Sequence, residues 1–415
     1  MADKLPPNGS PALMRAINAA RVVREIRAAG PVSRASLVRA TSLSKPTITN
    51  VVAHLEELGY VERVDRETVA TPNREARAPL YEYRASRGQV LGIDIGADKT
   101  LLLLADLSGN ILGSVRFATK TVTSRGQSRI FEEIAKASRK LLADAGATPA
   151  TLLSVVVGTP GVVSPDGVVT VAPQLEGWEG LNLAAAMAEL FTCPVAIESE
   201  VSLSLQAERW VGVAKGVDDA LFVQLGVGVG AGLLVKGQIH RGANGAAGEI
   251  GLMPYPLVGP SGDVELVAVE TLAGGGALLR KGQSLARTPE GAALRELAGG
   301  DADNVDASTV FAAMRGGDPA ATALVLEIVR LLAWAIASVV CAFNPQMVVI
   351  GGGLSRAADQ FLPRLEEMVA AAVPFAPTWF VSSLGDEAVA LGAVHNATAM
   401  VEADLFDRPA GARAL

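Results

Sequence analysis

The sequence is poor in cysteine and in aromatic residues. Only two of its 415 residues are cysteine, Cys193 and Cys341, and their separation does not suit a metal site. Each has apolar neighbours, so both are expected to be buried free thiols. Aromatic residues make up 4% of the chain and hydrophobic residues 50%, mostly Ala, Val and Leu, which is typical of a soluble α/β protein.

Long hydrophobic runs are also missing. No uninterrupted apolar run reaches the roughly 18 residues that a helix needs to span a bilayer. The N-terminal sequence MADKLPPNGSPALMR lacks the apolar core of a secretory signal. We therefore expect a cytoplasmic protein that does not enter a membrane.

Length and charge divide the chain into a basic front and an acidic body. A chain of 415 residues exceeds what one hydrophobic core usually spans, so two or three domains are expected. Residues 1–90 carry 14 Lys and Arg against 9 Asp and Glu, whereas the remainder carries 22 against 34. A cationic front suits phosphate binding, although many domains with this charge never touch DNA.

Three helices are predicted in the basic front. Residues 12–29 show helical periodicity and end at Gly30 and Pro31. Ser33 is a suitable N-cap for a short second helix, and Ser44 is one for a third helix that carries Pro46 in its first turn. The apolar residues of the third helix face inward, which leaves a polar face outward.

A short helix, a tight turn and a second helix with an exposed polar face form a helix-turn-helix, whose second helix enters the major groove of DNA. Predicted strands at residues 59–64 and 80–83 add an arginine-rich β-wing. The predicted DNA contacts are Ser44, Lys45, Thr47, Thr49 and Asn50 on the helix and Arg63, Arg66, Arg74 and Arg77 on the wing. A three-helix domain used for protein contacts is the alternative.

The body from about residue 88 contains two lobes with one plan. In the first, a buried strand at residues 90–96 continues into a β-hairpin, which excludes a dinucleotide-binding fold. A helix at 128–145 and a strand at 152–158 complete this lobe. The second lobe has a strand at 220–225, a hairpin that turns at Lys236 and Gly237, and a long helix at 319–343.

One glycine-rich stretch organises the second lobe. Residues 224–251 read QLGVGVGAGLLVKGQIHRGANGAAGEIG. Their glycines would let backbone N–H groups approach an anionic or hydroxylated ligand, and the carboxylate of Glu249 follows. Alternating glycines can also simply relieve packing in a strand, so both interpretations stay open.

Together these motifs resemble those of the ROK family (repressors, open reading frames and kinases), in particular its regulators with a winged helix fused to a sugar-kinase-like body. The resemblance runs from about residue 13 to residue 400. Its motifs are the winged helix at 33–61, phosphate loops at 94–96 and 225–232, the segments around Glu249 and Glu270, and the Asn344-Pro345 and 351–353 segments. The resemblance implies an actin-like, ribonuclease-H-like ATPase fold with a sugar-binding cleft between its lobes, and a homodimer or tetramer.

The same resemblance suggests domain boundaries. We expect a disordered N-terminus at residues 1–11, a winged helix-turn-helix domain at 12–86 and a ROK body at 87–415. Lobe one would span about 87–200, lobe two about 201–390 and a C-terminal helix about 389–404.

The phosphate loops depart from those of the family's kinases. In the first loop Asp94 and Gly96 remain, but Ala97 and Asp98 replace a Gly-Thr pair, and an added carboxylate repels a triphosphate. In the second loop, between Gly226 and Gly228, Val227 stands where the family usually carries Thr. Both changes remove a phosphate-binding hydroxyl.

The catalytic stretch departs as well. The kinase pattern Glu-Asn-Asp-x-Asn aligns with residues 198–202, so Ser199 and Ser202 replace two sugar-binding Asn and Glu200 replaces the general-base Asp. Phosphoryl transfer depends on positioning and on charge stabilisation, and both are altered. We therefore expect a lost kinase without catalytic residues.

The zinc site common in the family is absent too. Leu252 stands where a His is usual, and residues 256–263 contain no thiol. No metal and no other cofactor is expected. The resemblance implies an effector site at Ser199, Glu200, Glu249 and Glu270, although either of the last two glutamates could be a structural cap or ion pair. Trp178 could stack on a sugar ring or lie in the core.

The leading hypothesis is a DNA-binding repressor that senses a sugar or sugar derivative in a degenerate cleft and acts on a double-stranded operator. A ligand that prefers one lobe arrangement would bias the spacing of two winged helices in a dimer. Two alternatives remain open. One is an active ATP-dependent sugar kinase with a DNA-binding appendage, and the other is a ligand-independent DNA-binding dimer.

Overall fold

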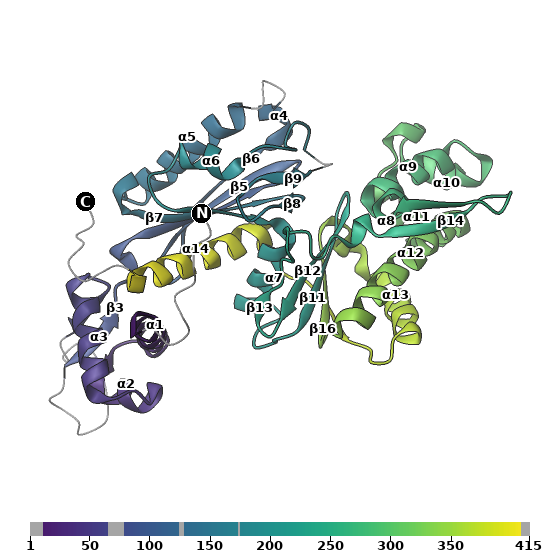
Figure 1. Ribbon diagram of the computed structural model, residues 1–415. Helices are drawn as coiled ribbons and strands as arrows, with labels where there is room; N and C mark the ends of the chain where they lie inside the picture. Colours follow the sequence, from purple (N-terminus) through teal and green to yellow (C-terminus); the bar gives the residue numbers. More distant parts are fainter. Residues whose placement is uncertain (1–10, 65–78, 124–127, 173–174, 408–415) are drawn as a thin grey trace.

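The chain forms a small N-terminal domain and a two-lobed body (Figure 1). The structure, a computed structural model, describes residues 11–64, 79–123, 128–172 and 175–407. The predicted disorder at residues 1–11 lies outside this range except at Pro11, which already belongs to helix α1 (Pro11–Ala29).

Helices α2 (Arg34–Thr41) and α3 (Lys45–Glu57) follow α1 in the N-terminal domain. Both start at the predicted caps. Ser33 Oγ accepts a hydrogen bond from Ser36 N at 3.1 Å, and Ser44 Oγ accepts one from Thr47 N at 3.3 Å. The three predicted helices and both caps are confirmed.

A three-stranded sheet with the order β1-β3-β2 completes this domain, built from β1 (Val32–Ser33), β2 (Val61–Val64) and β3 (Leu80–Tyr83). Ile48, Val52 and Leu55 of α3 are fully buried, which confirms the inward face of that helix. Strands β2 and β3 pair antiparallel and form the base of the predicted wing.

Lobe one is a five-stranded sheet with the order β10-β7-β4-β5-β6. Its strands are β4 (Gln89–Ile95), β5 (Lys99–Asp106), β6 (Ile111–Ala118), β7 (Leu152–Thr159) and β10 (Val195–Ser199). Strands β4, β5 and β6 are antiparallel neighbours, which confirms the predicted hairpin, whereas β4, β7 and β10 run parallel.

Side-chain alternation along β5 buries both faces of this sheet. Leu102 and Leu104 pack with helix α5 (Arg129–Asp144), while Leu101 and Leu103 pack with the C-terminal helix α14 (Ala388–Asp407). Figure 1 shows these two helices on opposite sides of the sheet. Shorter elements complete the lobe: α4 (Thr119–Thr123), β8 (Val162–Val163), β9 (Val169–Val171) and α6 (Leu183–Ala188).

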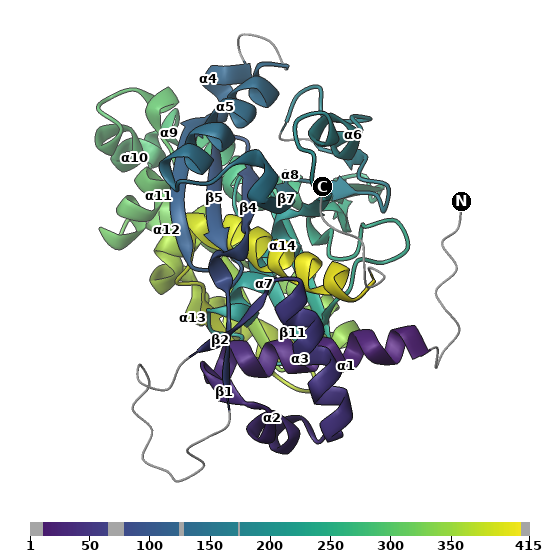
Figure 2. The ribbon, with the colours of Figure 1, turned by 90° about the vertical axis from the view of Figure 1, so that its left-hand side faces the viewer.

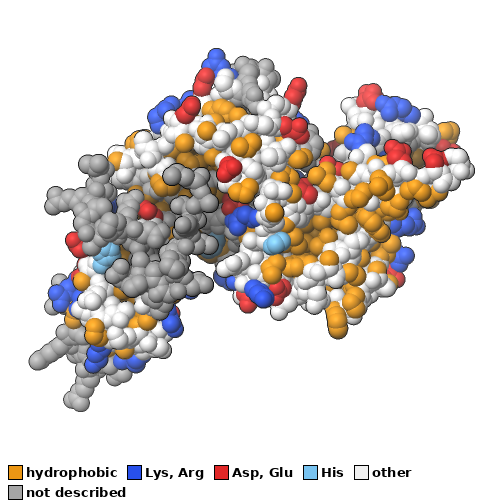
Figure 3. All heavy atoms as spheres, in the orientation of Figure 1, with side chains coloured by type: hydrophobic (Ala, Val, Ile, Leu, Met, Phe, Trp, Pro, Cys, Tyr) orange, Lys and Arg blue, Asp and Glu red, His pale blue; other side chains and the backbone are white. Residues whose placement is uncertain are grey.

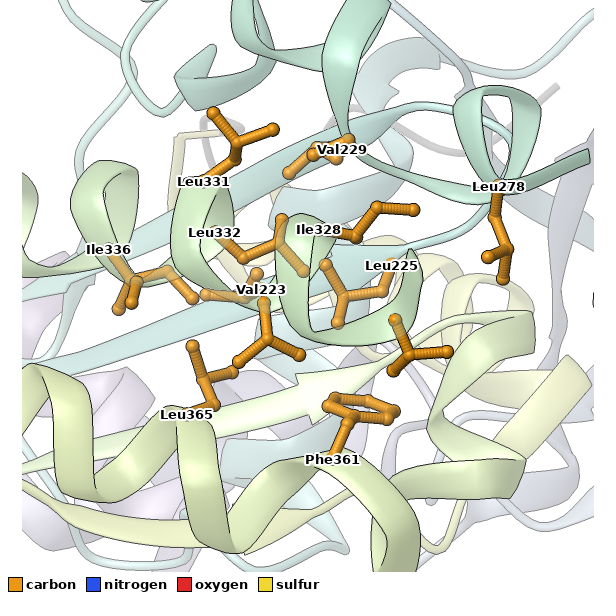
Figure 4. Close-up of a cluster of buried hydrophobic side chains, with 14 of the residues drawn as sticks. Val223, Leu225, Val229, Leu278, Ile328, Leu331, Leu332, Ile336, Phe361 and Leu365 are labelled. Atoms are coloured by element: carbon orange, nitrogen blue, oxygen red, sulfur yellow. The ribbon is translucent and has the colours of Figure 1, made fainter. Parts of the chain in front are cut away.

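Lobe two is built on a second five-stranded sheet with the order β13-β12-β11-β16-β17. Its strands are β11 (Ala220–Leu225), β12 (Val229–Val235), β13 (Gln238–Ile239), β16 (Met347–Gly351) and β17 (Thr378–Val381). Helices α12 (Pro319–Phe343) and α13 (Ala358–Ala372) cover one face. Figure 4 shows Ile328 and Leu332 of α12 and Leu365 of α13 gathered near Val223. Helix α7 (Glu200–Trp210) packs on the other face through Leu205.

An appendage extends lobe two away from lobe one (Figure 1). It contains the hairpin of β14 (Pro254–Val258) and β15 (Val264–Ala268) and four helices. The helices are α8 (Val269–Leu272), α9 (Gly275–Ala286), α10 (Ala292–Leu297) and α11 (Ala307–Arg315).

The structure corrects the expectation that both cysteines are buried and settles the alternatives left open for Trp178. Cys341 is exposed because it lies on an outward face of α12, and Cys193 is only partly buried in the loop before β10, so local apolar neighbours do not decide burial. Trp178 is 1% exposed in the core of lobe one, with its ring centroid 6.3 Å from that of Phe131, so it is no wall of the cleft.

Helix α12 bears on the expectation that no apolar run is long enough to span a membrane. Among the described residues it is the one helix long and apolar enough to cross a membrane. Glu327 and Arg330 interrupt its apolar run, and 61% of its most apolar window is buried inside lobe two. The apolar composition of α12 is therefore explained by its place in the hydrophobic core of lobe two.

Candidate functional site

A cleft of about 470 Å³ lies between the two lobes. Both phosphate loops and all four residues of the predicted effector site line it. The lining residues with a predicted role are Asp94, Gly96, Ala97, Asp98, Ser199, Glu200, Gly226, Val227, Gly228, Glu249 and Glu270. Ser202 lies deeper, and its hydroxyl accepts a hydrogen bond from Ser199 Oγ at 2.9 Å.

Asp94 lies one residue before the end of the buried strand β4 and lines the cleft. The nearest cation is Lys99, whose Nζ lies 3.6 Å from Asp94 Oδ2. Burial raises the pKa of Asp94 to about 6, and the attraction of Lys99 partly offsets this rise. This carboxyl is thus poised to change its charge just below neutral pH.

Glu200 is the first residue of α7 and occupies the centre of a carboxylate cluster. Burial raises its pKa to about 8, and repulsion from Asp94 and Glu249 adds to the rise, while a hydrogen bond with Gln224 opposes it. At neutral pH Glu200 is therefore mostly protonated. In this form the carboxyl donates as well as accepts hydrogen bonds, but it is not a general base.

Glu249 and Glu270 lie close enough for their charges to interact, and Glu249 follows a tight backbone crossing between Gly248 and Ala231. Gly248 precedes Glu249 with φ of 94°, and a Cβ at this glycine would lie 2.0 Å from Ala231 O, so no side chain fits here. Burial raises the pKa of Glu249, and the nearby charge of Glu270 raises it further. The two carboxyls form one acidic wall of the cleft.

The second glycine loop is held by a run of glycines that sequence reasoning missed. Gly275 N donates to Gly226 O at 2.8 Å, and Gly276 N donates to Val227 O at 2.9 Å. The side chain of Val227 is 58% exposed toward the cleft. The Gly-Gly-Gly sequence at 274–276, which forms the N-cap and first two residues of helix α9, was the available signal.

An ionic cluster at the rim of the cleft was also missed. Asp386 Oδ1 accepts from Arg356 Nη2 at 3.1 Å, its Oδ2 lies 3.5 Å from Arg116 Nη1, and its backbone oxygen accepts from Lys99 Nζ at 2.5 Å. These four residues come from both lobes and lie far apart in the sequence, so no local pattern could have identified them. We call them the Asp386 cluster.

Two further ion pairs change the expected electrostatics. Lys120 Nζ lies 2.6 Å from Asp98 Oδ1, which offsets part of the negative charge that Asp98 brings to the first phosphate loop. Arg241 of lobe two contacts both oxygens of Glu198 in lobe one, with its Nη2 2.6 Å from Glu198 Oε1. The second pair joins the lobes beside Ser199.

Metal ligands do not converge in the described part of the chain, where no group of three or more His, Cys, Asp or Glu side chains could hold a metal ion. At the cleft, Leu252 is 41% exposed and contributes an apolar surface. The hairpin of β14 and β15 occupies the place of the family's usual cysteine run, as a paired strand segment.

The predicted DNA-binding face is only partly available to a partner. Lys45, Thr49 and Asn50 are exposed on the first turns of α3. Thr47 is half-buried, and its hydroxyl lies 2.8 Å from that of Ser44, which caps the helix. On the wing, Arg63 is exposed on β2, whereas Arg66, Arg74 and Arg77 lie outside the described residues.

Comparisons with known proteins match both parts of the chain. The family model described as MarR family matches residues 15–70, and the model described as ROK family matches residues 90–399. The chain is 28% identical over 417 residues to the xylose repressor of Caldicellulosiruptor bescii, over 97% of this chain and 99% of that protein. It is 27% identical over 365 residues to the N-acetylglucosamine repressor of Escherichia coli O157:H7, over 87% of this chain and 86% of that protein.

Solved structures share the fold. A ROK family transcriptional regulator, a homolog of the E. coli MLC protein, aligns with a TM-score of 0.75 and 22% identity over 94% of this chain and 98% of its own. A ROK family glucokinase from Streptomyces griseus, in complex with glucose and AMPPNP, aligns with a TM-score of 0.62 and 26% identity over 75% of this chain and 99% of its own. The predicted winged helix-turn-helix and kinase-like body are thereby confirmed, and since the ROK model covers most of the sequence, the chain belongs to the ROK family.

Proposed function

We propose that this protein is a DNA-binding transcriptional repressor that senses a sugar or sugar derivative in the cleft between its lobes. The observation that carries the proposal is the union, in one chain, of a winged helix with an exposed polar face and a ROK body whose cleft is lined by the carboxyl groups of Asp94, Glu200, Glu249 and Glu270, among others. Relatives that match most of the chain are named xylose repressor and N-acetylglucosamine repressor, which supports the same function.

DNA would be read by α3 in the major groove. Asn50 suits the donor and acceptor pair of adenine, and Lys45 suits guanine or a phosphate. Ser44 and Thr47 hold the first turn of α3 through their hydroxyl contact and through the bond from Thr47 N to Ser44 Oγ, which fixes the start of the helix from which Lys45 extends. Arg63 would contact the backbone beside the wing, and we propose the same role for Arg74 and Arg77.

The effector would be a polar molecule rich in hydroxyl groups. The carboxyls of Glu249 and Glu270 supply acceptors, and protonated Glu200 supplies a donor next to the hydroxyl of Ser199. A cleft of about 470 Å³ is within the size range of small-molecule sites. Leu252 and Val227 add apolar surface that suits the C–H faces of a sugar ring.

Phosphoryl transfer is not part of the proposal. Burial and the neighbouring carboxylates raise the pKa of Glu200, so the ionised form that a kinase base needs to accept the proton of a sugar hydroxyl is a minor species at neutral pH. Val227 also offers no hydroxyl to a phosphate. The kinship with a glucokinase makes an active kinase the competing function. Magnesium-dependent ATP turnover with a hexose would establish that function and overturn ours.

We propose a homodimer or tetramer that uses lobe two. Hydrophobic side chains gather on the surface of this lobe in Figure 3. Val258 and Leu266 of the β14–β15 hairpin are 71% and 66% exposed, and Phe375 after α13 is 72% exposed. Pairing of two chains would present two winged helices to two half-sites of an operator.

The test is specific DNA binding by the purified protein to its own upstream region, at fixed salt, with and without D-xylose and N-acetylglucosamine. Fluorescence anisotropy should give a specific complex whose Kd changes with one of the sugars. Specific binding that ignores both sugars, together with no thermal shift from either, would leave a ligand-independent DNA-binding dimer as the better description. A ligand at a hundred times its Kd adds about 2.7 kcal/mol of stability, so such a shift is readily seen.

A further inference from the structure

Helix α14 connects the cleft with the N-terminal domain. Ala388 and Val389, at its start, line the cleft, and the Asp386 cluster immediately precedes them. Near the other end, Glu402 Oε1 accepts a hydrogen bond from Arg27 Nη1 of α1 at 2.5 Å. Fourteen residues at 1.5 Å each separate Ala388 from Glu402, a span of about 21 Å. Figures 1 and 2 show the helix passing from the body to the N-terminal domain.

Close backbone packing makes this helix a rigid element. A Cβ on Gly392 would lie 1.9 Å from Leu203 O of α7, and a Cβ on Gly92 of β4 would lie 2.5 Å from Ala390 O. Ser154 Oγ of β7 also donates to Ala397 O at 2.7 Å. Contacts of this kind leave little room for independent movement, so α14, α7 and the sheet of lobe one shift together.

Helix α7 brings a second input from the cleft to α14. Glu200 at its start lies in the carboxylate cluster, and Trp210 at its end stacks on His395 of α14 with 5.3 Å between ring centroids. Burial lowers the pKa of His395 to about 4, so the stacked imidazole is uncharged at neutral pH. Helix α7 therefore links the carboxylate cluster to the middle of α14 through direct contacts, in addition to the contacts at the start of α14.

At the far end, one hydrophobic cluster joins α14 to the DNA-binding helices. Ala397 and Val401 of α14 belong to the same buried cluster as Ile26 of α1 and Ile48 of α3. The Arg27–Glu402 pair borders this cluster, with side chains 30% and 17% exposed. An ion pair this shielded from water holds a defined geometry better than a solvated surface pair does.

We propose that α14 is the element that couples the effector cleft to the DNA-binding domain, and that the Arg27–Glu402 pair is the contact through which it sets the position of α1 and α3. This inference rests on the proposed function. Arg27 and Glu402 act here as positioning residues, because they touch neither the cleft nor the face of α3 that would meet DNA. Two distant sites are then joined by one packed element whose placement both can bias.

The test compares Glu402→Gln and Arg27→Met with the charge reversal that combines Arg27→Glu and Glu402→Arg. Asp359→Asn, which removes the exposed pair with Arg315 in lobe two, is the matched control.

For each protein, anisotropy gives the Kd for upstream DNA with and without D-xylose and N-acetylglucosamine, and thermal shift reports sugar binding. Wild type and control should show a sugar-dependent change of at least about fivefold in Kd. Both single variants should still bind sugar, but their change should fall below about twofold. The charge reversal should recover most of it.

Hydrogen exchange of α1 supplies a readout that needs no sugar. Asp386→Asn disturbs the cluster at the start of α14 and should change amide exchange on the buried face of α1 by at least about threefold. The same substitution in the Glu402→Gln background should add almost nothing, because the two sites then act through one contact. Unchanged α1 exchange in Asp386→Asn would refute the coupling role of α14.

The two proposals fail in different ways. A full sugar response in Glu402→Gln would overturn the role of the ion pair and leave the sensing repressor intact. A wild-type protein whose DNA binding ignores both sugars, but whose α1 exchange still follows Asp386→Asn, would overturn sugar sensing by these ligands and leave the coupling through α14 standing.

Discussion

Replacement of Gly392 by alanine should destabilise the body, although alanine favours a helix. Gly392 lies inside α14, where its missing side chain allows α7 to approach. The added Cβ would meet Leu203 O at 1.9 Å and Leu203 C at 2.5 Å, both of them backbone atoms that cannot rotate away. Ordinary carbon–oxygen contacts are about 3.3 Å or longer, so the helices must separate by roughly 1.4 Å.

The magnitude follows from two opposing effects. Overpacking of this kind costs about 1–3 kcal/mol, and separation of two whole helices places the cost at the upper end. Alanine returns about 1 kcal/mol through its helix preference. The net loss of about 2 kcal/mol corresponds to a drop of roughly 3 °C in the thermal midpoint of a body of this size, because the unfolding entropy is about 2.1 cal/mol/K per residue.

Differential scanning fluorimetry measures this drop, with Gly353→Ala as the control, because a Cβ at Gly353 meets no atom within 4 Å. The control should unfold within about 1 °C of wild type, since a substitution into open space changes stability little. A Gly392→Ala protein that unfolds at or above the wild-type midpoint would refute the reasoning, because the close approach of α7 and α14 would then not depend on glycine.

Four further outcomes are expected. The folded pKa of Glu200, about 8, lies above its ordinary value, so its stabilising contribution is complete at acid pH and is lost as the pH rises through 8. The thermal midpoint of Glu200→Gln relative to that of wild type should therefore rise between pH 5 and 9. Parallel pH profiles of the two midpoints would contradict this. Glu249→Gln should abolish the thermal shift caused by a sugar while the protein still binds DNA, and an undiminished shift would exclude Glu249 from the site. Lys45→Ala should weaken binding to all DNA sequences and reduce the slope of log affinity against log salt concentration by about 1. Asn50→Ala should instead reduce the preference for the correct base at one base pair by about 1–3 kcal/mol. Equal effects of Asn50→Ala on specific and unrelated DNA would argue against base reading by Asn50. Leu266→Glu should shift the sedimenting species toward monomer, and an unchanged mass would place the interface elsewhere.

The cleft of this protein combines features that would conflict in a kinase. Burial raises the pKa of Asp94, Glu200 and Glu249, and repulsion from neighbouring carboxylates adds to each rise, which favours a neutral hydroxylated ligand over a triphosphate. The Asp386 cluster spans the rim between the lobes beside the first phosphate loop. These features support the sensing function proposed above.

Much of the fold follows from local sequence. Helix α12 occurs at the predicted residues because Asp318 caps its start, with its carboxylate accepting from Ala321 N at 2.7 Å, and Asn344 ends it in a left-handed conformation with φ of 52°. Ser33 and Ser44 begin α2 and α3 for the same reason. Caps, turns and apolar periodicity act within a few residues, so the sequence alone determined these elements, and the family motifs determined which loops meet in the cleft.

Only the tertiary structure determined the features that depend on contacts between residues far apart in the sequence. Arg27 and Glu402 are 375 positions apart, and the Asp386 cluster draws on β5, β6 and both lobes, so neither has a local pattern. Cys341 is exposed and Trp178 is buried because each faces a surface or a core that other segments create. Burial, proton affinity and the path from cleft to DNA-binding domain arise only when the chain has packed, since each depends on which charges and backbones the fold brings within a few ångströms.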